Sequence, residues 1–390
     1  MAEFYIFNNG LMTENTMSGS DQRALNWSRI FSQHGHRVSV FTSAAGAVRF
    51  KPLGFTVCVT GKSFLKSNIG LFLVYLSRAI KSYLLQLRLS FEQDGVIYSS
   101  SDLLADAVPA VFMKFRKPAF KLVVGMHLIA PNPFKGFRKS HGAKGLRVPS
   151  LSNMYYFLFQ RLLIFVLKKK ASLVLVSNCS DRNFLLKRGL LAACTLVTYG
   201  ACDASFEDAV LDAPKAYEAI YIGRFHEQKG FPDLLRIWKE VSGEFPDARL
   251  IVLGEDITAR NIETLIHKYG MGSNIEFLGF VGGSRKYEYL KASRVCIFPS
   301  YYESFGIVVL EAMACGVPVA AYDLAVFSEI YSKGMLRAPV GDINSMARNI
   351  IELLRNDQKR RSISKEALDM SRQFSWGKTA SDILRKLALS

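Results

Sequence analysis

Short apolar runs alternate with longer amphipathic stretches from one end of the chain to the other. The runs are rich in β-branched and aromatic residues, which is typical of strands buried on both faces. Strand–helix alternation of this kind predicts an α/β fold with parallel sheets. We expect helices at 20–33, 231–245 and 376–389, and strands at 3–8, 38–42, 96–98, 121–125, 173–176, 221–222, 249–253, 275–278, 295–298 and 318–321.

The chain is long enough for two domains of this type. At 390 residues it exceeds the size at which a single hydrophobic core usually stops growing. An acidic, aperiodic stretch at 201–216 separates the two series of strands, so we expect a boundary near 200–217. Residues 1–200 carry a net charge of +18 and residues 201–390 a net charge of −1, which suggests two modules with different partners. With 49% apolar and 21% charged residues, the composition argues against long disordered segments.

The sequence predicts no metal cluster, disulfide framework or membrane span. The six cysteines are scattered and form no C-x-x-C pair, which is typical of thiols in a reducing compartment. Glu3 and Glu14 stand where a secretory signal would be basic. The most apolar stretch, 154–167, contains Arg161 and falls short of the roughly 20 apolar residues that a span needs. We therefore expect a cytoplasmic protein.

The most informative motif runs from Pro299 to Val319 and reads PSYYESFGIVVLEAMACGVPV. It follows a predicted strand, holds Glu303 in a loop and opens a short helix at Gly306. The free N–H groups and the dipole at a helix start attract a phosphate, and glycine lets an anion approach the backbone. Glu311, on the same helix, can accept hydrogen bonds from ribose hydroxyls. The structural alternative is that both glutamates are ordinary surface carboxylates.

A second motif, GRFHEQKG at 223–230, connects a predicted strand to a predicted helix. Arg224 and Lys229 can both reach one diphosphate, the arginine with a planar fork and the lysine as a point charge. Alone this pattern is weak, because basic loop residues are usually solvated. In one domain with the Glu303 loop, it predicts a site for a nucleoside diphosphate.

These motifs resemble those of the family-four retaining glycosyltransferases of the GT-B fold. Further fragments follow that family's order, namely SGSD at 18–21, QHGHRV at 33–38, FLGFV at 277–281 and FSW at 374–376. The turn YGACD at 199–203 departs from the family's usual Pro-Asn-Gly-Val-Asp. The resemblance implies two Rossmann-like domains with parallel sheets facing a central cleft. These are an acceptor-binding domain at 1–200, a nucleotide-sugar-binding domain at 201–373, and a helix at 374–390 that crosses back to the first domain.

The resemblance also implies roles for the matched positions. Arg224 and Lys229 would bind the diphosphate and stabilise the leaving group, and Glu311 would hold the ribose. His127, just after the strand at 121–125, would lie near the transferred sugar; the alternative is a purely structural histidine. The residues expected to act in catalysis are His127, Glu303, Arg224 and Lys229. The residues expected to bind the donor are Gly19, Arg224, Lys229, Val281, Glu303, Ser304, Phe305, Gly306, Ile307, Val308 and Glu311.

The implied reaction is transfer of a sugar from a nucleoside diphosphate sugar with retention at the anomeric carbon. We expect a UDP-sugar rather than a GDP-sugar as the donor. Charge that develops on the departing diphosphate can be met by Arg224, Lys229 and the helix start at Gly306. The chain contains no Asp-x-Asp motif, so we expect no metal ion and no other cofactor.

The basic N-terminal half predicts the kind of acceptor. Residues 111–170 alone carry a net charge of +13, and basic clusters at 115–117, 135–139 and 168–170 frame the apolar stretch 154–167. This composition is typical of a surface that lies on an anionic membrane. We therefore expect a glycan or lipid-linked acceptor, in cell-envelope polysaccharide, lipopolysaccharide or glycolipid synthesis. Peripheral attachment to the inner face of the cytoplasmic membrane would follow; a buried domain helix at 154–167 is the alternative.

Two other classes of function share these features. A sugar-nucleotide epimerase on the same fold would form product without an acceptor. A non-catalytic protein that binds membranes or nucleic acid could have the same fold without transferase activity. The sequence shows no recognition helix or RNA-binding signature, so we expect no nucleic-acid partner.

Overall fold

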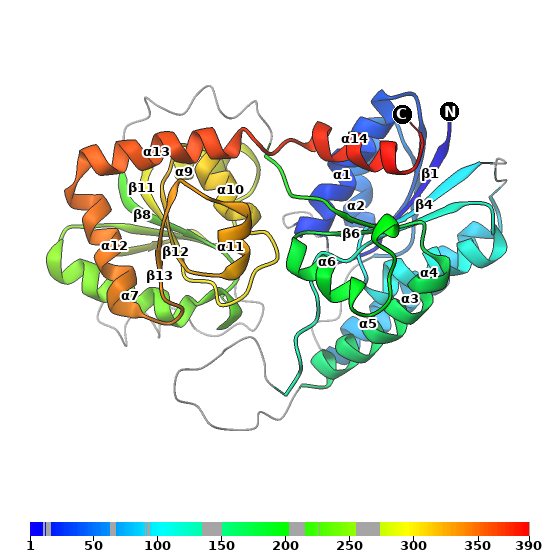
Figure 1. Ribbon diagram of the computed structural model, residues 1–390, viewed down its shortest axis with the longest axis horizontal. Helices are drawn as coiled ribbons and strands as arrows, with labels where there is room; N and C mark the ends of the chain where they lie inside the picture. Colours follow the sequence, from blue (N-terminus) through cyan, green and yellow to red (C-terminus); the bar gives the residue numbers. More distant parts are fainter. Residues whose placement is uncertain are drawn as a thin grey trace. The chain divides into compact units, whose positions relative to one another are not determined.

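The computed structural model describes residues 1–389 apart from 11, 13–16, 63–67, 90, 92–93, 135–149, 203–214, 226 and 255–273. The basic cluster predicted at 135–139 therefore lies outside the described residues. The described chain forms two compact units (Figure 1). The N-terminal unit contains the described residues up to Gly200 together with those from Trp376 onward, and the C-terminal unit contains Ala201–Ser375.

The N-terminal unit is built on one parallel sheet. Over its described residues the strand order is β3-β2-β1-β4-β5-β6-β7. The strands are β1 (Glu3–Asn8), β2 (Arg37–Thr42), β3 (Thr56–Val59), β4 (Gly95–Ser99), β5 (Lys121–Gly125), β6 (Leu173–Val176) and β7 (Thr195–Val197). The helices are α1 (Gly19–Gln33), α2 (Ala44–Phe50), α3 (Asn68–Gln86), α4 (Leu104–Arg116), α5 (Leu151–Lys170), α6 (Cys179–Leu186) and α14 (Trp376–Lys386), with 3-10 turns η1 (Lys51–Leu53) and η2 (Ala192–Cys194).

The C-terminal unit repeats this plan with a second parallel sheet. Its described strands follow the order β10-β9-β8-β11-β12-β13. They are β8 (Tyr217–Ile222), β9 (Leu250–Leu253), β10 (Ile275–Phe277), β11 (Ser293–Phe298), β12 (Val319–Tyr322) and β13 (Met335–Ala338). The helices are α7 (Phe231–Glu244), α9 (Gly283–Lys291), α10 (Ile307–Ala314), α11 (Ala325–Ile330), α12 (Ile343–Arg355) and α13 (Asp357–Ser371), with the 3-10 turn η4 (Glu227–Lys229).

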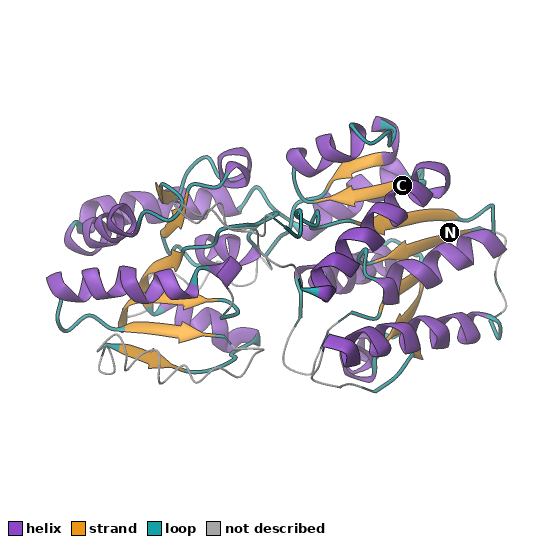
Figure 2. Ribbon diagram, turned by 90° about the horizontal axis from the view of Figure 1, so that it is seen from below, coloured by secondary structure: helices purple, strands orange, loops and turns teal. Residues whose placement is uncertain are grey.

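The order of strands reverses once in each sheet. In the C-terminal unit the chain leaves β8 in one direction along the sheet and returns through β11 on the other side of β8. Helices cover both faces of each sheet, so the central strands are buried on both sides (Figure 2). The predicted α/β fold with parallel sheets is confirmed. In open sheets of this kind ligands bind beyond the carboxyl ends of the strands, where the order reverses.

The last helix packs in the N-terminal unit. The indole N–H of Trp27 on α1 donates to Thr379 Oγ1 of α14 at 2.9 Å, and the rings of Trp27 and Trp376 lie 6.3 Å apart. Trp27 is fully buried. The helix that closes the chain is therefore part of the core of the first unit.

Helix α5, which contains the apolar stretch 154–167, is buried on one side only. Gln160, Leu163, Ile164 and Leu167 face the core, whereas Leu158 and Leu162 are exposed. The alternative of a buried domain helix at 154–167 therefore holds for one face of α5 only. None of the described helices is both long and apolar enough to cross a membrane.

Candidate functional site

Two loops join at the carboxyl ends of β8 and β11, where the second sheet reverses its strand order. The backbone N–H of Tyr301 donates to the carbonyl of Gln228 at 2.8 Å, and the Gln228 amide donates to the carbonyl of Tyr302 at 3.0 Å. Gly230 has a φ of +68°, and a Cβ at this position would lie 1.8 Å from the carbonyl oxygen of Pro299. The backbones of the two loops therefore touch, and glycine is required at the contact.

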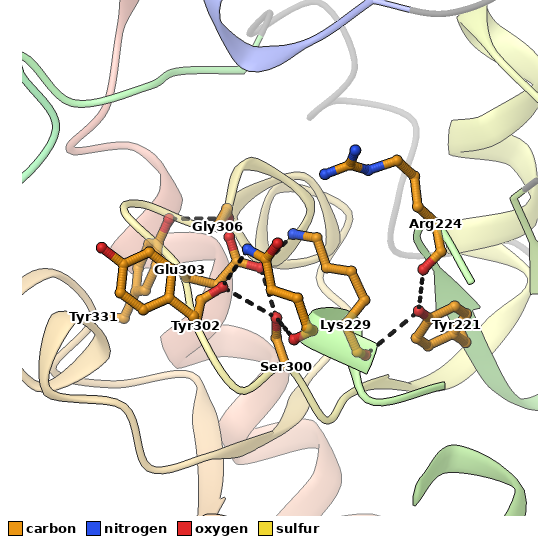
Figure 3. Close-up of polar contacts among 9 residues, drawn as sticks. Tyr221, Arg224, Lys229, Ser300, Tyr302, Glu303, Gly306 and Tyr331 are labelled. Atoms are coloured by element: carbon orange, nitrogen blue, oxygen red, sulfur yellow. Dashed lines mark hydrogen bonds and ion pairs between the residues drawn. The ribbon is translucent and has the colours of Figure 1, made fainter. Parts of the chain in front are cut away.

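Lys229 and Glu303 meet across this junction. Their side chains form an ion pair with 20% and 10% of their surface exposed (Figure 3). The hydroxyl of Ser300 donates to the same carboxylate at 2.8 Å. Because both charges are mostly shielded from water, each depends on the other for compensation. The ion pair thus offers a bound ligand one cation and one carboxylate in fixed positions.

Arg224 lies on the first loop, directly after β8. The hydroxyl of Tyr221 approaches the carbonyl oxygens of Arg224 and Lys229, at 3.2 and 3.4 Å, and so ties the two ends of the loop together. The Arg224 side chain is exposed, and its guanidinium extends away from Tyr221 (Figure 3). The arrangement presents two cations from one short loop.

Helix α10 begins beside the same pair. Its N-cap is Gly306, with a φ of +81° and no side-chain cap. The first N–H groups of a helix have no partner one turn back, and here those of Ile307 and Val308 belong to half-buried residues. The next one, that of Val309, donates to the Gly306 carbonyl at 2.9 Å. The Phe305 side chain is buried against Tyr331 and Phe374 and anchors the loop. Of this residue, only the backbone can therefore contact the donor. Ser304 is half-buried on the same loop.

Glu311 lies deeper on α10 and has a partner that the sequence did not predict. Lys286 Nζ of α9 lies 2.6 Å from Glu311 Oε1, and 4% of the glutamate side chain is exposed. The Tyr287 hydroxyl lies 3.3 Å from the same oxygen. Lys286 was missed because a basic residue on a short polar helix is usually solvated.

Val281 lies between β10 and α9 and is half-buried. It follows Gly279, whose φ is +66° and whose carbonyl accepts from the N–H of Gly254 at 2.7 Å. Gly254 in turn approaches Gly223 so closely that a Cβ would lie 2.0 Å from the Gly223 carbonyl oxygen. The loops after β8, β9 and β10 are thus linked backbone to backbone.

The two remaining predicted residues, Gly19 and His127, belong to the N-terminal unit. Gly19 is the first residue of α1, after Ser18, which caps the helix and shares a capping box with Asp21. Its carbonyl accepts from Arg23 Nη1 at 3.2 Å. Gly19 is therefore the first residue of the helix, in a turn where the Ser18 hydroxyl already accepts from the N–H of Asp21.

His127 follows β5 and is 7% exposed. Its Nδ1 lies 3.2 Å from the Ser177 hydroxyl, to which Arg23 Nη2 donates at 3.3 Å. Its Nε2 is buried without a hydrogen-bond partner among the described residues. Burial, and secondly the charge of Arg23, hold the pKa of His127 well below its usual value, so the ring is neutral at pH 7.

This depressed pKa predicts a pH dependence of stability. Below about pH 6.5 the unfolded chain binds a proton that folded His127 does not, so this contribution to stability is lost as the pH falls. The slope of this loss cannot exceed about 1.4 kcal/mol per pH unit, which is the limit for a single proton. We expect His127→Gln to lose less unfolding free energy than the wild type between pH 7.5 and 5, as measured in urea. Equal losses in both proteins would contradict the assignment.

Comparison with known proteins shows which proteins the chain resembles. The family model described as glycosyl transferases group 1 matches residues 205–370. The chain is 33% identical over 172 residues to the phosphatidyl-myo-inositol mannosyltransferase of Mycobacterium leprae, covering 43% of this chain and 45% of that protein. It is 29% identical over 167 residues to the O-antigen chain mannosyltransferase B of Escherichia coli, covering 40% and 42%. The matches thus span less than half the length of these relatives.

Solved structures match over the whole chain. Anabaena HepE, in complex with UDP and glucose, superposes with a TM-score of 0.74 at 17% identity and 100% coverage of both chains. The sucrose-phosphate synthase of Thermosynechococcus elongatus gives 0.75 at 18%, again with 100% coverage of both. The fold is therefore that of the GT-B glycosyltransferases, as the resemblance implied. Residues 205–370 match the model of the group 1 glycosyl transferases, so the predicted resemblance is confirmed at that level, and the assignment to the retaining family four stays a prediction.

Proposed function

We propose that this chain is a retaining glycosyltransferase that moves a sugar from a nucleoside diphosphate sugar to a glycan or lipid-linked acceptor. The observation that carries the proposal is the junction of the β8 and β11 loops. It holds Lys229, Glu303 and the start of α10 together at the reversal of strand order, inside the segment that the family model matches. Open α/β sheets bind nucleotides at this place.

The junction supplies what departure of a diphosphate requires. The bond between the anomeric carbon and the diphosphate oxygen breaks, and the carbon bonds to an acceptor hydroxyl oxygen on the same face. The acceptor proton passes to the departing diphosphate. Negative charge grows on the diphosphate, where Arg224, Lys229 and the N–H groups of Ile307 and Val308 would stabilise it. No metal ion is needed for this step.

The remaining residues would position the donor. Glu303 would accept hydrogen bonds from the sugar, and Glu311 from the ribose, with Lys286 paired to the Glu311 carboxylate. The backbone near Val281 would meet the base. In the N-terminal unit, Gly19 would contact the diphosphate, and neutral His127 would lie near the transferred sugar.

The relatives suggest the donor sugar and the class of acceptor. Both named relatives are mannosyltransferases, one acting on phosphatidyl-myo-inositol and the other on O-antigen chains. We propose an acceptor of this general class, carried on a lipid in cell-envelope glycan or glycolipid synthesis. We propose a UDP-sugar rather than a GDP-sugar as the donor, and mannose is among the sugars to be tested. The protein would work while bound peripherally to the cytoplasmic membrane.

A thermal-shift panel of UDP, GDP, ADP and their common sugars tests the donor site. A ligand at 100 times its Kd should add about 2.7 kcal/mol of stability. We expect one nucleotide to stabilise the wild type and to lose this effect in the Arg224→Ala/Lys229→Ala variant. Lys239→Ala, an exposed lysine on α7, is the matched control. If no nucleotide stabilises the protein, the transferase proposal fails, and product formed without any acceptor would indicate an epimerase instead.

A further inference from the structure

Two helices of the N-terminal unit expose apolar stripes to solvent. On α3, Leu73, Ile80 and Leu84 recur at spacings of seven and four, which places them on one face of the helix. On α5, Leu158, Leu162 and Phe165 do the same at spacings of four and three. Each of the six keeps 50% to 63% of its surface exposed. Scattered single apolar residues are normal on a protein surface, but stripes on neighbouring helices indicate a binding surface.

The stripes belong to one continuous surface that also includes α4. The rings of Tyr83 on α3 and Phe112 on α4 lie 5.6 Å apart, and Phe72 on α3 packs edge-on against Tyr155 on α5 at 5.1 Å. The amine of Lys170 at the end of α5 lies 5.1 Å from the centre of the Phe115 ring on α4. The three helices lie side by side (Figure 1). We call the outer surface of α3, α4 and α5 the helical face.

The helical face carries charge of one sign. Lys81, Arg116 and 168–170 are exposed at its edges. The single carboxylate within the three helices, Asp106, is 1% exposed and therefore contributes nothing to the outer surface. Apolar side chains interleaved with lysine and arginine, without exposed acid, are the composition of helices that lie in the interface of an anionic bilayer.

We propose that the helical face docks on an anionic lipid bilayer, with the α3 and α5 stripes entering the acyl boundary and the lysines contacting lipid phosphates. A second copy of the chain is a poorer occupant. A twofold interface places the same surface patch on both subunits, so the lysines at 168–170 would face like charges. The inference deepens the proposed function on its acceptor side, since it names the surface that would bring a lipid-linked acceptor within reach.

Vesicle flotation tests the proposal on the full chain. The vesicles are equal parts phosphatidylglycerol and phosphatidylcholine, or phosphatidylcholine alone, in 50 mM and 500 mM salt. We expect binding to the anionic vesicles at low salt only. An apolar variant (Ile80→Ser/Leu84→Ser/Leu158→Ser/Leu162→Ser) should bind at least tenfold more weakly. A charge variant, with Lys168, Lys169 and Lys170 each changed to Gln, should lose on the order of 100-fold at low salt.

Matched variants test whether vesicle binding depends on the helical face or on any exposed apolar residues and lysines. Val48→Ser/Leu191→Ser removes two exposed apolar residues from other elements, and Lys239→Gln/Lys333→Gln/Lys365→Gln removes three exposed lysines from the C-terminal unit. Both should bind vesicles like the wild type. Circular dichroism and the nucleotide-induced thermal shift should be unchanged in every variant, which distinguishes lost docking from lost folding or a failed donor site.

Three results would overturn the proposal. The wild type could fail to float with anionic vesicles at low salt, or the helical-face variants could bind as tightly as their matched controls. Sedimentation could also show a wild-type dimer that the apolar variant converts to a monomer, with no vesicle binding, and the face would then be an interface between copies. A protein that binds vesicles but no nucleotide would leave the docking proposal standing and refute the transferase.

Discussion

Replacement of Lys229 by glutamine is expected to lower kcat/KM for donor consumption by about a thousandfold. Removing one preorganised group that meets developing charge typically costs 100- to 1,000-fold. Lys229 also compensates the carboxylate of Glu303, of which 10% is exposed, so the variant leaves that charge without its cation. The rate is measured with the best donor from the nucleotide panel, using water or a lipid acceptor.

A purely structural role for this ion pair makes a different prediction. If Lys229 serves only to neutralise Glu303, the Lys229→Gln/Glu303→Gln variant should regain stability and react as fast as Glu303→Gln alone. If Lys229 stabilises the leaving group, the double variant should regain stability but react about 100- to 1,000-fold more slowly than Glu303→Gln. Lys239→Gln on α7 controls for the loss of a lysine from the same unit and should react like the wild type. A double variant that reacts as fast as Glu303→Gln would refute the catalytic assignment of Lys229.

The interior strands were predictable because their residues are apolar on both faces. All ten predicted strands are present, from β1 to β12; nine of them are interior, and β10 is at a sheet edge. The three strands that were missed, β3, β7 and β13, lie at sheet edges. Edge strands have one unpaired side and short, partly exposed sequences, so they lack the continuous apolar pattern.

Only the local parts of the site could be predicted from the sequence. The loop after β8 and the start of α10 were predictable because their glycines and charged residues are neighbours in the sequence. The direct contact of Lys229 with Glu303 could not, because it depends on β11 lying beside β8 in the sheet. The pairing of Glu311 with Lys286 is likewise a tertiary contact.

Helix α3 shows a further limit of sequence reasoning. Its sequence is apolar almost all round, with Leu71 and Val74 half-buried as well as Leu73 and Ile80 exposed. A helix of that composition reads as a core element. Only the packing of α3 beside α4 shows which apolar residues remain on the surface.

The largest loss of stability is expected from Gly230→Ala. A non-glycine residue at a φ of +68° costs about 1–2 kcal/mol, and the overlap of a methyl group with the Pro299 carbonyl adds about 1–3 kcal/mol. We therefore expect about 3 kcal/mol of destabilisation, which lowers the apparent Tm of the C-terminal unit by roughly 6–12 °C. Because Gly230 follows Lys229 directly, donor affinity should fall with it.

Gly243→Ala, on the same helix α7, is the matched control. A Cβ at Gly243 would meet nothing within 4 Å, and its φ lies outside the left-handed region. Alanine is the better helix former by about 0.5–1 kcal/mol, so this variant should be as stable as the wild type or slightly more so. Differential scanning calorimetry of both variants, with and without the best nucleotide, makes the comparison. Equal transition temperatures for Gly230→Ala and the wild type would mean that the two loops can separate at Pro299. The geometry that holds Lys229 against Glu303 would then not depend on glycine.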